Sequence, residues 1–382
     1  MRAGAIRPRV VAWESTLACN LACIHCRAHA QTEPDPNELN TDEVKAVIDD
    51  MASFGSPIFI ISGGEPLMRP DVLEIASYAR ERGLIPALSP NGTLIDRPMA
   101  REIRKAGVSR ISVSIDGPNA ASHDAIRGVS GAFDAAVEGI ANCRAEDVAF
   151  QINTTVIRHN LTQLEGIQQW VTQQGAAAWH LFMLVPTGRG STDDAISAAE
   201  YEELLGWIYA QAGQSLVPMR VTCGPQFMRL VAQRGGAPPA GIERARRHRE
   251  RQGANGNRAV QQNGARHPVS GHPGGGTSRG CMAADGYCFV SRSGEVYPCG
   301  YLPLSGGNVR DRSLQEIYQE SNLFKSLRDL GRLEGRCGPC EYRGVCGGCR
   351  ARSFASTGNI LGQDPLCVYE PGQAMGGPCH AR

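Results

Sequence analysis

Short apolar runs alternate with longer amphipathic segments over the first two thirds of the chain. Six of these runs have the length and composition typical of β-strands. They cover residues 9–16, 57–62, 85–89, 110–115, 149–156 and 179–185. The run at 57–62 (PIFIIS) is continuously apolar, which predicts a strand that is buried on both faces.

Each apolar run is followed by a segment with helical periodicity. In residues 41–54, for example, Val44, Val47, Ile48 and Met51 fall on one face of a helix. The predicted helices cover residues 41–54, 70–82, 97–106, 132–143, 161–174 and 198–211. Such alternation predicts a parallel sheet with right-handed crossovers. Six units are too few for an eight-stranded barrel, so the predicted fold class is α/β with a partial (β/α)6 TIM barrel.

The charge balance excludes some classes of partner. The 382 residues include 39 basic and 38 acidic side chains, a net charge of +1, so no overall field favours a nucleic acid or an anionic membrane. No apolar run reaches the roughly 18 residues that a membrane span needs. Residues 1–9 are basic but no apolar stretch follows them, so no signal peptide is predicted. We therefore expect a cytoplasmic protein with no transmembrane segment and no nucleic-acid partner.

Fourteen cysteines are unevenly distributed along the chain. Three lie within residues 19–26, and eight lie between residues 281 and 367. Disulfide scaffolds are usually short secreted domains, so a reduced compartment and metal ligation are the better interpretation. Of the other three, Cys143 and Cys223 are predicted to be packed thiols, and Cys379 lies in a predicted frayed tail.

The first three cysteines directly follow the first predicted strand. Cys19, Cys23 and Cys26 are separated by three and then by two residues. Three thiolates can bind three irons of a [4Fe–4S] cluster and leave the fourth iron open. The alternatives are a zinc site that uses His25 as its fourth ligand and three unrelated buried thiols.

Glycine and polar residues follow the later predicted strands. The active site of a barrel collects at the carboxyl ends of its strands. In Gly63-Gly64-Glu65-Pro66, after the second strand, the glycines allow close backbone approach, and the carboxylate can accept a hydrogen bond from a ligand ammonium group. Corresponding positions after later strands include Asn91, Ser114, Asp116, Arg127 and residues 186–190. Taken singly, each glycine pair is better explained as a tight turn.

The C-terminal cysteines form a second group. Its members are Cys281, Cys288, Cys299, Cys337, Cys340, Cys346, Cys349 and Cys367. Short β-rich runs on both sides of residues 292–294 predict a hairpin, and residues 314–330 predict a helix. Two CxxC pairs are also typical of a zinc ribbon, but eight cysteines make two sets of four.

Composition divides the chain into four parts. Residues 1–224 form the predicted barrel, and residues 280–370 form the predicted cysteine-rich domain. Residues 225–279 lose apolar content and contain a basic cluster, which predicts a flexible linker or insertion. Residues 371–382 are predicted to be a disordered tail.

The cysteine loop and the strand-end turns together resemble the radical SAM superfamily. This resemblance implies a radical SAM core in which the loop holds a [4Fe–4S] cluster and S-adenosylmethionine binds the open iron. Reductive cleavage would give methionine and a 5′-deoxyadenosyl radical, which abstracts a hydrogen atom from the substrate. The implied S-adenosylmethionine pocket is formed by Gly63, Gly64, Glu65, Pro66, Asn91, Ser114, Asp116 and Arg127. Its first four residues would contact the methionine amino group, Ser114 and Asp116 would lie near the ribose, and Arg127 near the methionine carboxylate.

The C-terminal group resembles the SPASM iron–sulfur domain, which holds two auxiliary [4Fe–4S] clusters. By this resemblance one cluster is bound by Cys281, Cys288, Cys299 and Cys349. The other is bound by Cys337, Cys340, Cys346 and Cys367. Two residues separate Cys346 from Cys349 where the commoner SPASM form has three, so the division between the two clusters stays open.

Longer stretches, among them PIFIISGGEPLMRPD and CGPCEYRGVCGGCRARSFASTG, resemble the haem synthases of alternative haem biosynthesis. The resemblance implies decarboxylation of two iron-coproporphyrin III propionates to the vinyl groups of protohaem, with electrons from a reductase and flavodoxin or a ferredoxin. Arg189, His180 and Arg350 are candidates to contact the propionates, although a surface or packing role is favoured for each. A packing role is favoured for His25. The alternatives are a radical SAM maturase of a ribosomal peptide, an enzyme of haem d1 formation and a non-catalytic iron–sulfur carrier.

Overall fold

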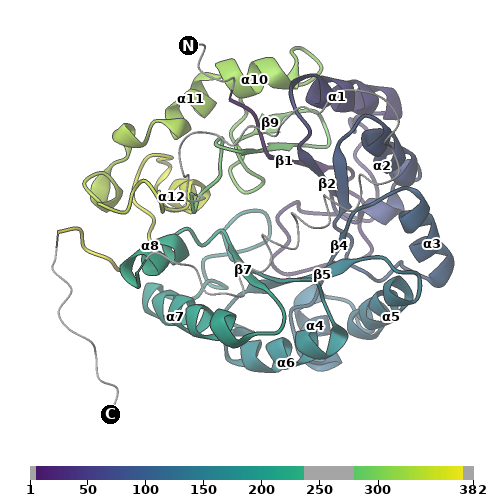
Figure 1. Ribbon diagram of the computed structural model, residues 1–382, viewed down its shortest axis with the longest axis horizontal. Coiled ribbons are helices and arrows are strands. Elements are labelled where there is room, and N and C mark those ends of the chain that lie inside the picture. The colour runs from purple at the N-terminus through teal and green to yellow at the C-terminus, as the bar shows by residue number, and fades with distance from the viewer. Residues whose placement is uncertain (1–5, 236–278, 373–382) are drawn as a thin grey trace, which may run out of the picture.

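A computed structural model describes residues 6–235 and 279–372, and in these residues nine strands form one sheet with helices around it (Figure 1). The strands are β1 (Val10–Glu14), β2 (Ile58–Ser62), β3 (Ile85–Leu88), β4 (Ile111–Ser114), β5 (Phe150–Val156), β6 (Trp179–Met183), β7 (Met219–Thr222), β8 (Tyr287–Val290) and β9 (Val296–Tyr297). The helices are α1 (Thr41–Phe54), α2 (Val72–Glu81), α3 (Arg97–Lys105), α4 (Ala120–Arg127), α5 (Ala132–Ala145), α6 (Leu164–Gln174), α7 (Ala198–Gln214), α8 (Gln226–Gln233), α10 (Leu314–Glu320), α11 (Asn322–Arg328) and α12 (Arg350–Thr357).

The sheet has the strand order β7-β6-β5-β4-β3-β2-β1-β8-β9. From β1 to β7, each strand pairs in parallel with the next one in sequence, as a series of βα units requires. The sheet curls, and helices α1 to α7 surround its convex side (Figure 1). The predicted partial barrel is therefore confirmed, and it contains a seventh parallel strand, β7, that the sequence did not predict.

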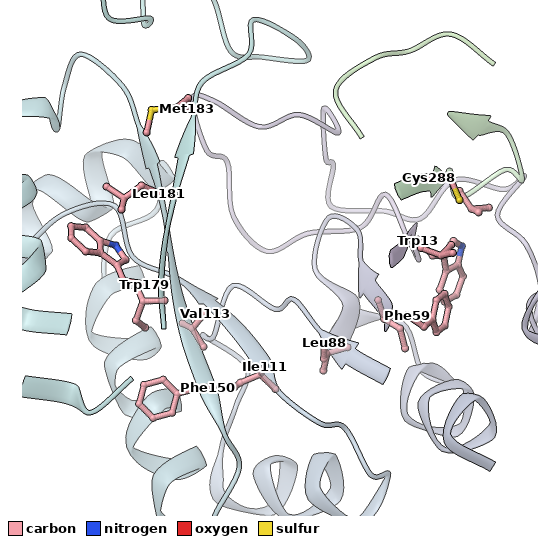
Figure 2. Close-up of a cluster of buried hydrophobic side chains, with 14 of the residues drawn as sticks. Trp13, Phe59, Leu88, Ile111, Val113, Phe150, Trp179, Leu181, Met183 and Cys288 are labelled. Atoms are coloured by element: carbon pink, nitrogen blue, oxygen red, sulfur yellow. The ribbon is translucent and has the colours of Figure 1, made fainter. Parts of the chain in front are cut away.

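Strand residues alternate between a packed outer face and a more open inner face. Phe59, Val113 and Leu181 belong to the hydrophobic core under the helices (Figure 2). Their neighbours along the strands, such as Ile60 and Ser114, face the concave side and are only partly buried. The prediction that β2 is buried on both faces was wrong, because Ile58, Ile60 and Ser62 on its inner face are only partly buried.

The C-terminal segment is joined to both edges of the curled sheet. At one edge β8 pairs in parallel with β1, and β8 and β9 form the predicted hairpin. At the other edge, Arg352 of α12 donates a hydrogen bond of 2.8 Å to the carbonyl oxygen of Cys223, which follows β7. The helix α10 packs against α1. The cysteine-rich segment thus spans the opening between the first and last strands of the barrel.

The start of the predicted linker belongs to the packed structure. Helix α8 buries Phe227 and Leu230 in the core, so the predicted boundary at residues 224–225 was wrong there. This helix is only eight residues long, too short for its apolar periodicity to stand out in the sequence. The rest of that predicted linker, residues 236–278, and the predicted tail with Cys379 lie outside the described residues.

Other helices also differ from the predicted ones. The predicted helix at residues 314–330 is divided into α10 and α11 by the extended backbone of Ser321. The helices α4 and α12 were not predicted, because each is only eight residues long. In the described part of the chain, no helix is long and apolar enough to span a membrane.

Candidate functional site

Backbone hydrogen bonds fix the cysteine loop, residues 15–31, at the end of β1. The amide of Cys19 donates to the carbonyl oxygen of Gln31 at 2.6 Å, which closes the loop. The amide of Ala22 donates to the carbonyl oxygen of Arg127 at 3.0 Å, in the last turn of α4. Helix α4, which the sequence did not predict, therefore supports the cysteine loop.

The three sulfur atoms of the loop all accept hydrogen bonds. Cys19 and Cys26 accept from backbone amides at 3.4 Å, and Cys23 accepts from Arg127 at 3.6 Å. Burial raises the pKa of the Cys19 thiol to about 11, so a thiolate at this position needs positive charge nearby, which iron supplies. Hydrogen bonds to sulfur are also one of the means by which proteins tune a cluster.

The turn after β2 lies directly against the cysteine loop. The amide of Gly64 donates to the carbonyl oxygen of Thr16, and the amide of Glu65 donates to that of Ala18, both at 2.7 Å. A Cβ atom at Gly64 would lie 2.3 Å from the carbonyl oxygen of Ala18. Glycine is therefore required here by the close approach of two backbone segments. Pro66 then begins a short 3-10 turn.

The carboxyl group of Glu65 is completely buried between two strand-end turns. Its oxygens accept from the backbone amides of Asn91 at 2.6 Å and Leu67 at 3.0 Å. Burial raises the pKa of this carboxyl to about 7, against the opposite effect of these hydrogen bonds. The group thus titrates near neutral pH, and its contact with a ligand amino group stays a prediction.

Asn91 connects its own turn to the cysteine loop. Its side-chain amide donates to the side-chain oxygen of Asn20 at 2.7 Å, and its oxygen accepts from the hydroxyl of Thr93 at 2.8 Å. Asn20 in turn donates to Thr93 at 2.7 Å. This ring of three polar side chains places the Asn91 turn beside the cysteines, as the sequence predicted for the edge of a barrel.

Asp116 joins the loop, α4 and β5 from a fully buried position. One carboxylate oxygen lies 2.6 Å from Nη2 of Arg127 and 2.8 Å from Nε2 of His25, and the other accepts from the amide of Thr155 at 2.8 Å. Burial opposes the charge, but Arg127 and His25 hold the pKa of Asp116 well below its usual range. Ser114, the last residue of β4, lies two residues before Asp116 and is partly exposed on the inner face. Contacts of this group with S-adenosylmethionine stay predictions.

The side chain of Arg189 is directed toward the backbone of the cysteine loop. Its guanidinium donates to the carbonyl oxygens of Cys23 at 2.9 Å and Ala30 at 2.8 Å, and its amide donates to that of Cys26 at 2.8 Å. Gly188 has a positive φ of 62°, and a Cβ there would lie 2.3 Å from the Cys26 carbonyl oxygen. Arg189 is thus held by the cysteine loop, and its contact with a propionate stays a prediction.

Four of the C-terminal cysteines line one cavity. They are Cys337, Cys340, Cys346 and Cys367. The sulfur of Cys346 accepts from the amide of Gly348 at 3.4 Å, and that of Cys337 accepts from Arg350 at 3.8 Å. One of the two predicted sets of four is thus brought together around a common space, which we call the four-cysteine cavity.

The other predicted set is only partly brought together. Electrostatic interactions connect the thiols of Cys281, Cys299 and Cys349, which we call the three-cysteine group. Cys288 lies elsewhere, in the middle of β8, where its charged neighbour is Arg328 of α11. The structure therefore does not place Cys288 beside the cysteines with which it was grouped.

The two remaining candidates for propionate contacts lie in different environments. Arg350 is completely buried and donates to the carbonyl oxygens of Ile360 at 3.1 Å and Gly362 at 2.7 Å. It supports the four-cysteine cavity and has no exposed surface for a carboxylate. His180 lies on β6, and its side chain faces the inner side of the sheet. A contact of His180 with a propionate stays a prediction.

Sequence reasoning missed several residues that shape these sites. Arg352 and Asp364 form a buried ion pair of 2.9 Å beside the three-cysteine group, and no sequence pattern indicates that two residues twelve apart should pair. The signals for α4 were visible at its ends. Asn119 caps its first turn by accepting from the amide of Ser122, and Gly128 ends it in the left-handed conformation.

Comparisons with known proteins agree with this arrangement. The chain matches the radical SAM superfamily over residues 13–171 and the SPASM iron–sulfur cluster-binding domain over residues 281–354. It is 44% identical over 366 residues to the AdoMet-dependent heme synthase of Methanosarcina barkeri, with 96% of this chain and 98% of the relative covered. It is 45% identical over 365 residues to the AdoMet-dependent heme synthase of Nitratidesulfovibrio vulgaris, with 95% and 93% covered. The solved structure of native anSMEcpe with bound AdoMet has a TM-score of 0.66 at 18% identity, with 94% of each chain covered, and supports the fold.

The fold and the matched domains define a radical SAM enzyme with a SPASM domain. Within this class, the chain belongs to the AdoMet-dependent heme synthase family. Its cofactors are S-adenosylmethionine and [4Fe–4S] clusters, and the donor sets fit them: three sulfurs in one loop, four around one cavity and a further three-cysteine group. In the described residues, no three cysteine, histidine or acidic side chains meet closely enough to enclose a single metal ion. A [4Fe–4S] cluster can be bound by sulfurs that lie farther apart, because each thiolate binds a different iron.

Proposed function

We propose that this enzyme converts iron-coproporphyrin III into protohaem by oxidative decarboxylation of two propionates. Each propionate would lose a hydrogen atom from its β-carbon, CO2 and one electron, and so become a vinyl group. When bound, the loop cluster and S-adenosylmethionine supply the 5′-deoxyadenosyl radical that takes the hydrogen atom. The chain's own residues must hold the porphyrin near that radical and provide a route for the electron.

The observation that carries the proposal is a direct link between the two cysteine regions. Arg27, the residue after Cys26, donates to the carbonyl oxygen of Gly300, the residue after Cys299, at 3.3 Å. The same guanidinium lies over the ring of Phe289, 4.5 Å from its centroid. A radical that forms beside the loop cluster is therefore close to cysteines that can hold an electron acceptor, as loss of CO2 from a radical requires.

Glu14 holds this link in place at the end of β1. Its buried carboxylate pairs with Arg27 at 3.1 Å and with Arg292 of the hairpin turn at 2.8 Å. Two cationic side chains from opposite ends of the chain thus share one carboxylate. Breaking such a pair would leave a buried charge without a partner, which is costly, so the shared carboxylate holds the hairpin turn against the cysteine loop.

The inner face of the sheet provides surfaces that suit a flat, aromatic and anionic substrate. Phe182 lies on the inner side of β6 and is partly exposed. His180 of β6 is paired with Arg220 of β7. Aromatic rings can pack on a porphyrin, and a neighbouring histidine and arginine are suitable partners for a propionate carboxylate.

The test is anaerobic incubation of the reconstituted protein with iron-coproporphyrin III, S-adenosylmethionine and a reductant. We expect a porphyrin product that has lost both carboxyl groups as CO2, with one 5′-deoxyadenosine formed for each propionate, measured by mass spectrometry. Formation of 5′-deoxyadenosine without any change in the porphyrin mass would contradict the proposal. That outcome would favour a peptide maturase or an enzyme of haem d1 formation instead.

We further propose a flavodoxin with its reductase, or a ferredoxin, as the physiological electron donor. Reductive cleavage of S-adenosylmethionine consumes one electron at the loop cluster, and a reduced carrier protein would supply it. Replacing the chemical reductant with each reduced protein in turn tests this point. Product formation with neither protein, although the chemical reductant supports it, would contradict the proposal about the donor without affecting the proposal about the substrate.

A further inference from the structure

Cys223 lies at the edge of the barrel that faces the C-terminal cysteines. It directly follows β7 and has a positive φ of 57°, which is uncommon for a residue with a side chain. Its carbonyl oxygen accepts the 2.8 Å hydrogen bond from Arg352. Arg352 lies three residues after Cys349, the residue that begins α12. This contact holds Cys223 beside the helix end that carries a member of the three-cysteine group.

The side chain of Cys223 also faces that group. Its thiol interacts electrostatically with the thiols of Cys349, Cys299 and Cys281, which come from three separate segments of the chain. Cys223 therefore occupies the place where a fourth ligand of a cluster would be needed.

Cys288 faces the opposite side of the sheet. It is paired in parallel register with Val11, and Val290 is paired with Trp13. Side chains at paired positions of parallel strands point to the same face. Val11 and Trp13 belong to the hydrophobic core under the helices, and Figure 2 shows Cys288 beside Trp13. Its thiol thus points toward the outer layer, where Tyr318 of α10 is its neighbour.

We propose that Cys223, and not Cys288, is the fourth cysteine ligand of the auxiliary cluster bound by Cys281, Cys299 and Cys349. This assignment replaces one residue of the set implied by the resemblance to SPASM domains. With this ligand set, the cluster would also cross-link the end of β7 to the C-terminal hairpin and to α12. The inference concerns the cluster alone and does not depend on which substrate the enzyme uses.

The experiment compares Cys223→Ala and Cys223→Ser with two matched controls in the full-length, anaerobically reconstituted protein. Cys288→Ala removes the competing residue, and Cys143→Ala removes a buried thiol in α5 whose pKa is raised by burial alone. Iron and acid-labile sulfide are measured for each chain, and EPR spectra are recorded after reduction. The change that S-adenosylmethionine causes in the spectrum of the loop cluster serves in every variant as an internal check of folding.

We expect both Cys223 variants to lose up to about one third of their iron, because one of three clusters loses a ligand, and to lose one auxiliary EPR signal. Their loop cluster should still respond to S-adenosylmethionine. Cys288→Ala and Cys143→Ala should match the parent protein. The proposal is overturned if the Cys223 variants keep the parental iron content and spectrum, or if Cys288→Ala loses the same signal.

A second measurement uses the parent protein and so needs no variant to fold. Cys223 is partly exposed, whereas Cys288 is completely buried. We expect a thiol-alkylating reagent to modify Cys223 only after a chelator has removed the iron, as read by peptide mass spectrometry. Modification of Cys223 in the fully loaded protein would show that its sulfur is free and would overturn the assignment. Neither measurement involves a porphyrin, so failure of this inference can be told apart from failure of the proposed function.

Discussion

The cysteine loop and the C-terminal cysteine region bind clusters in the same molecule but are assembled differently. All three cysteines of the loop lie within eight residues and follow one strand. Those of the C-terminal region come from the hairpin, from the segment before α12, from the start of α12 and from the segment after it. One site is thus carried by a continuous segment, and the other exists only when distant segments fold together.

Each region is nevertheless supported by a buried aspartate–arginine pair. Asp116 pairs with Arg127 at 2.6 Å, and Arg127 also donates to a cysteine sulfur of the loop. Asp364 pairs with Arg352 at 2.9 Å and accepts from the amide of Cys349 at 2.8 Å. Both aspartates are completely buried. The comparison suggests that a cluster-binding segment, whether continuous or assembled, is held in shape by a charged pair that the surrounding protein shields from water.

The largest effect that separates the two regions is expected from removing one cysteine of each. Cys23→Ala should abolish formation of 5′-deoxyadenosine, because the loop cluster loses a ligand. Cys340→Ala should keep that activity with a strong reductant but form no vinyl product, because one of the two auxiliary clusters on the electron's route is damaged. Both products are measured by mass spectrometry in one reaction. Complete loss of 5′-deoxyadenosine in a folded Cys340→Ala protein would show that the regions do not act separately.

Neutralising the two buried aspartates is the next test of the comparison. Asp116→Asn and Asp364→Asn should each lower the free energy of unfolding by about 3–5 kcal/mol, because each leaves a buried arginine without its charged partner. Denaturant unfolding measures this loss. The EPR spectra should differ, with the loop cluster weakened in the first variant and an auxiliary cluster in the second. Loss of the same cluster in both variants would contradict the view that each pair serves its own region.

The same difference explains what the sequence could predict. The spacing of Cys19, Cys23 and Cys26 and the turn at Gly64 are local patterns, and the structure brings them together as expected from strand ends in a barrel. The direction in which Cys288 points could not be predicted from the sequence, since the face to which a strand residue points depends on the pairing of β8 with β1. Cys223 has no sequence signal at all, because its proximity to the C-terminal cysteines arises only when the sheet curls.

A smaller effect is expected from the arginine that binds the cysteine loop. Arg189→Ala should lower the free energy of unfolding by about 1–3 kcal/mol, because two buried carbonyl oxygens lose their donor, and should speed iron loss from the loop cluster. Arg343→Ala is the matched control in the C-terminal region, where an exposed arginine donates to the carbonyl oxygen of Gly338 at 2.7 Å. Unfolding and chelator-driven iron release measure both variants. If the two variants lost the same free energy of unfolding and released iron equally fast, burial of the accepting carbonyl oxygens would not make the Arg189 contacts stronger than the Arg343 contact.

The smallest expected effect concerns the pH dependence of S-adenosylmethionine binding in the loop region. Burial raises the pKa of Glu65 to about 7, and an amino group bound nearby would favour its ionised form and lower that pKa. Binding would then release a proton below pH 7, so affinity should rise with pH by up to about tenfold per unit until pH 7 and then level off. In Glu65→Gln this contribution is absent, while any titration of the ligand itself remains.

The ratio of parental to variant affinity therefore isolates Glu65, and equilibrium binding between pH 6 and pH 8 measures it. We expect this ratio to increase from pH 6 to pH 7. A constant ratio would mean that the buried carboxyl only joins the turns at Asn91 and Leu67. The loop region would then resemble the C-terminal region more closely, with its buried acid serving to hold backbone segments together and not to recognise the ligand.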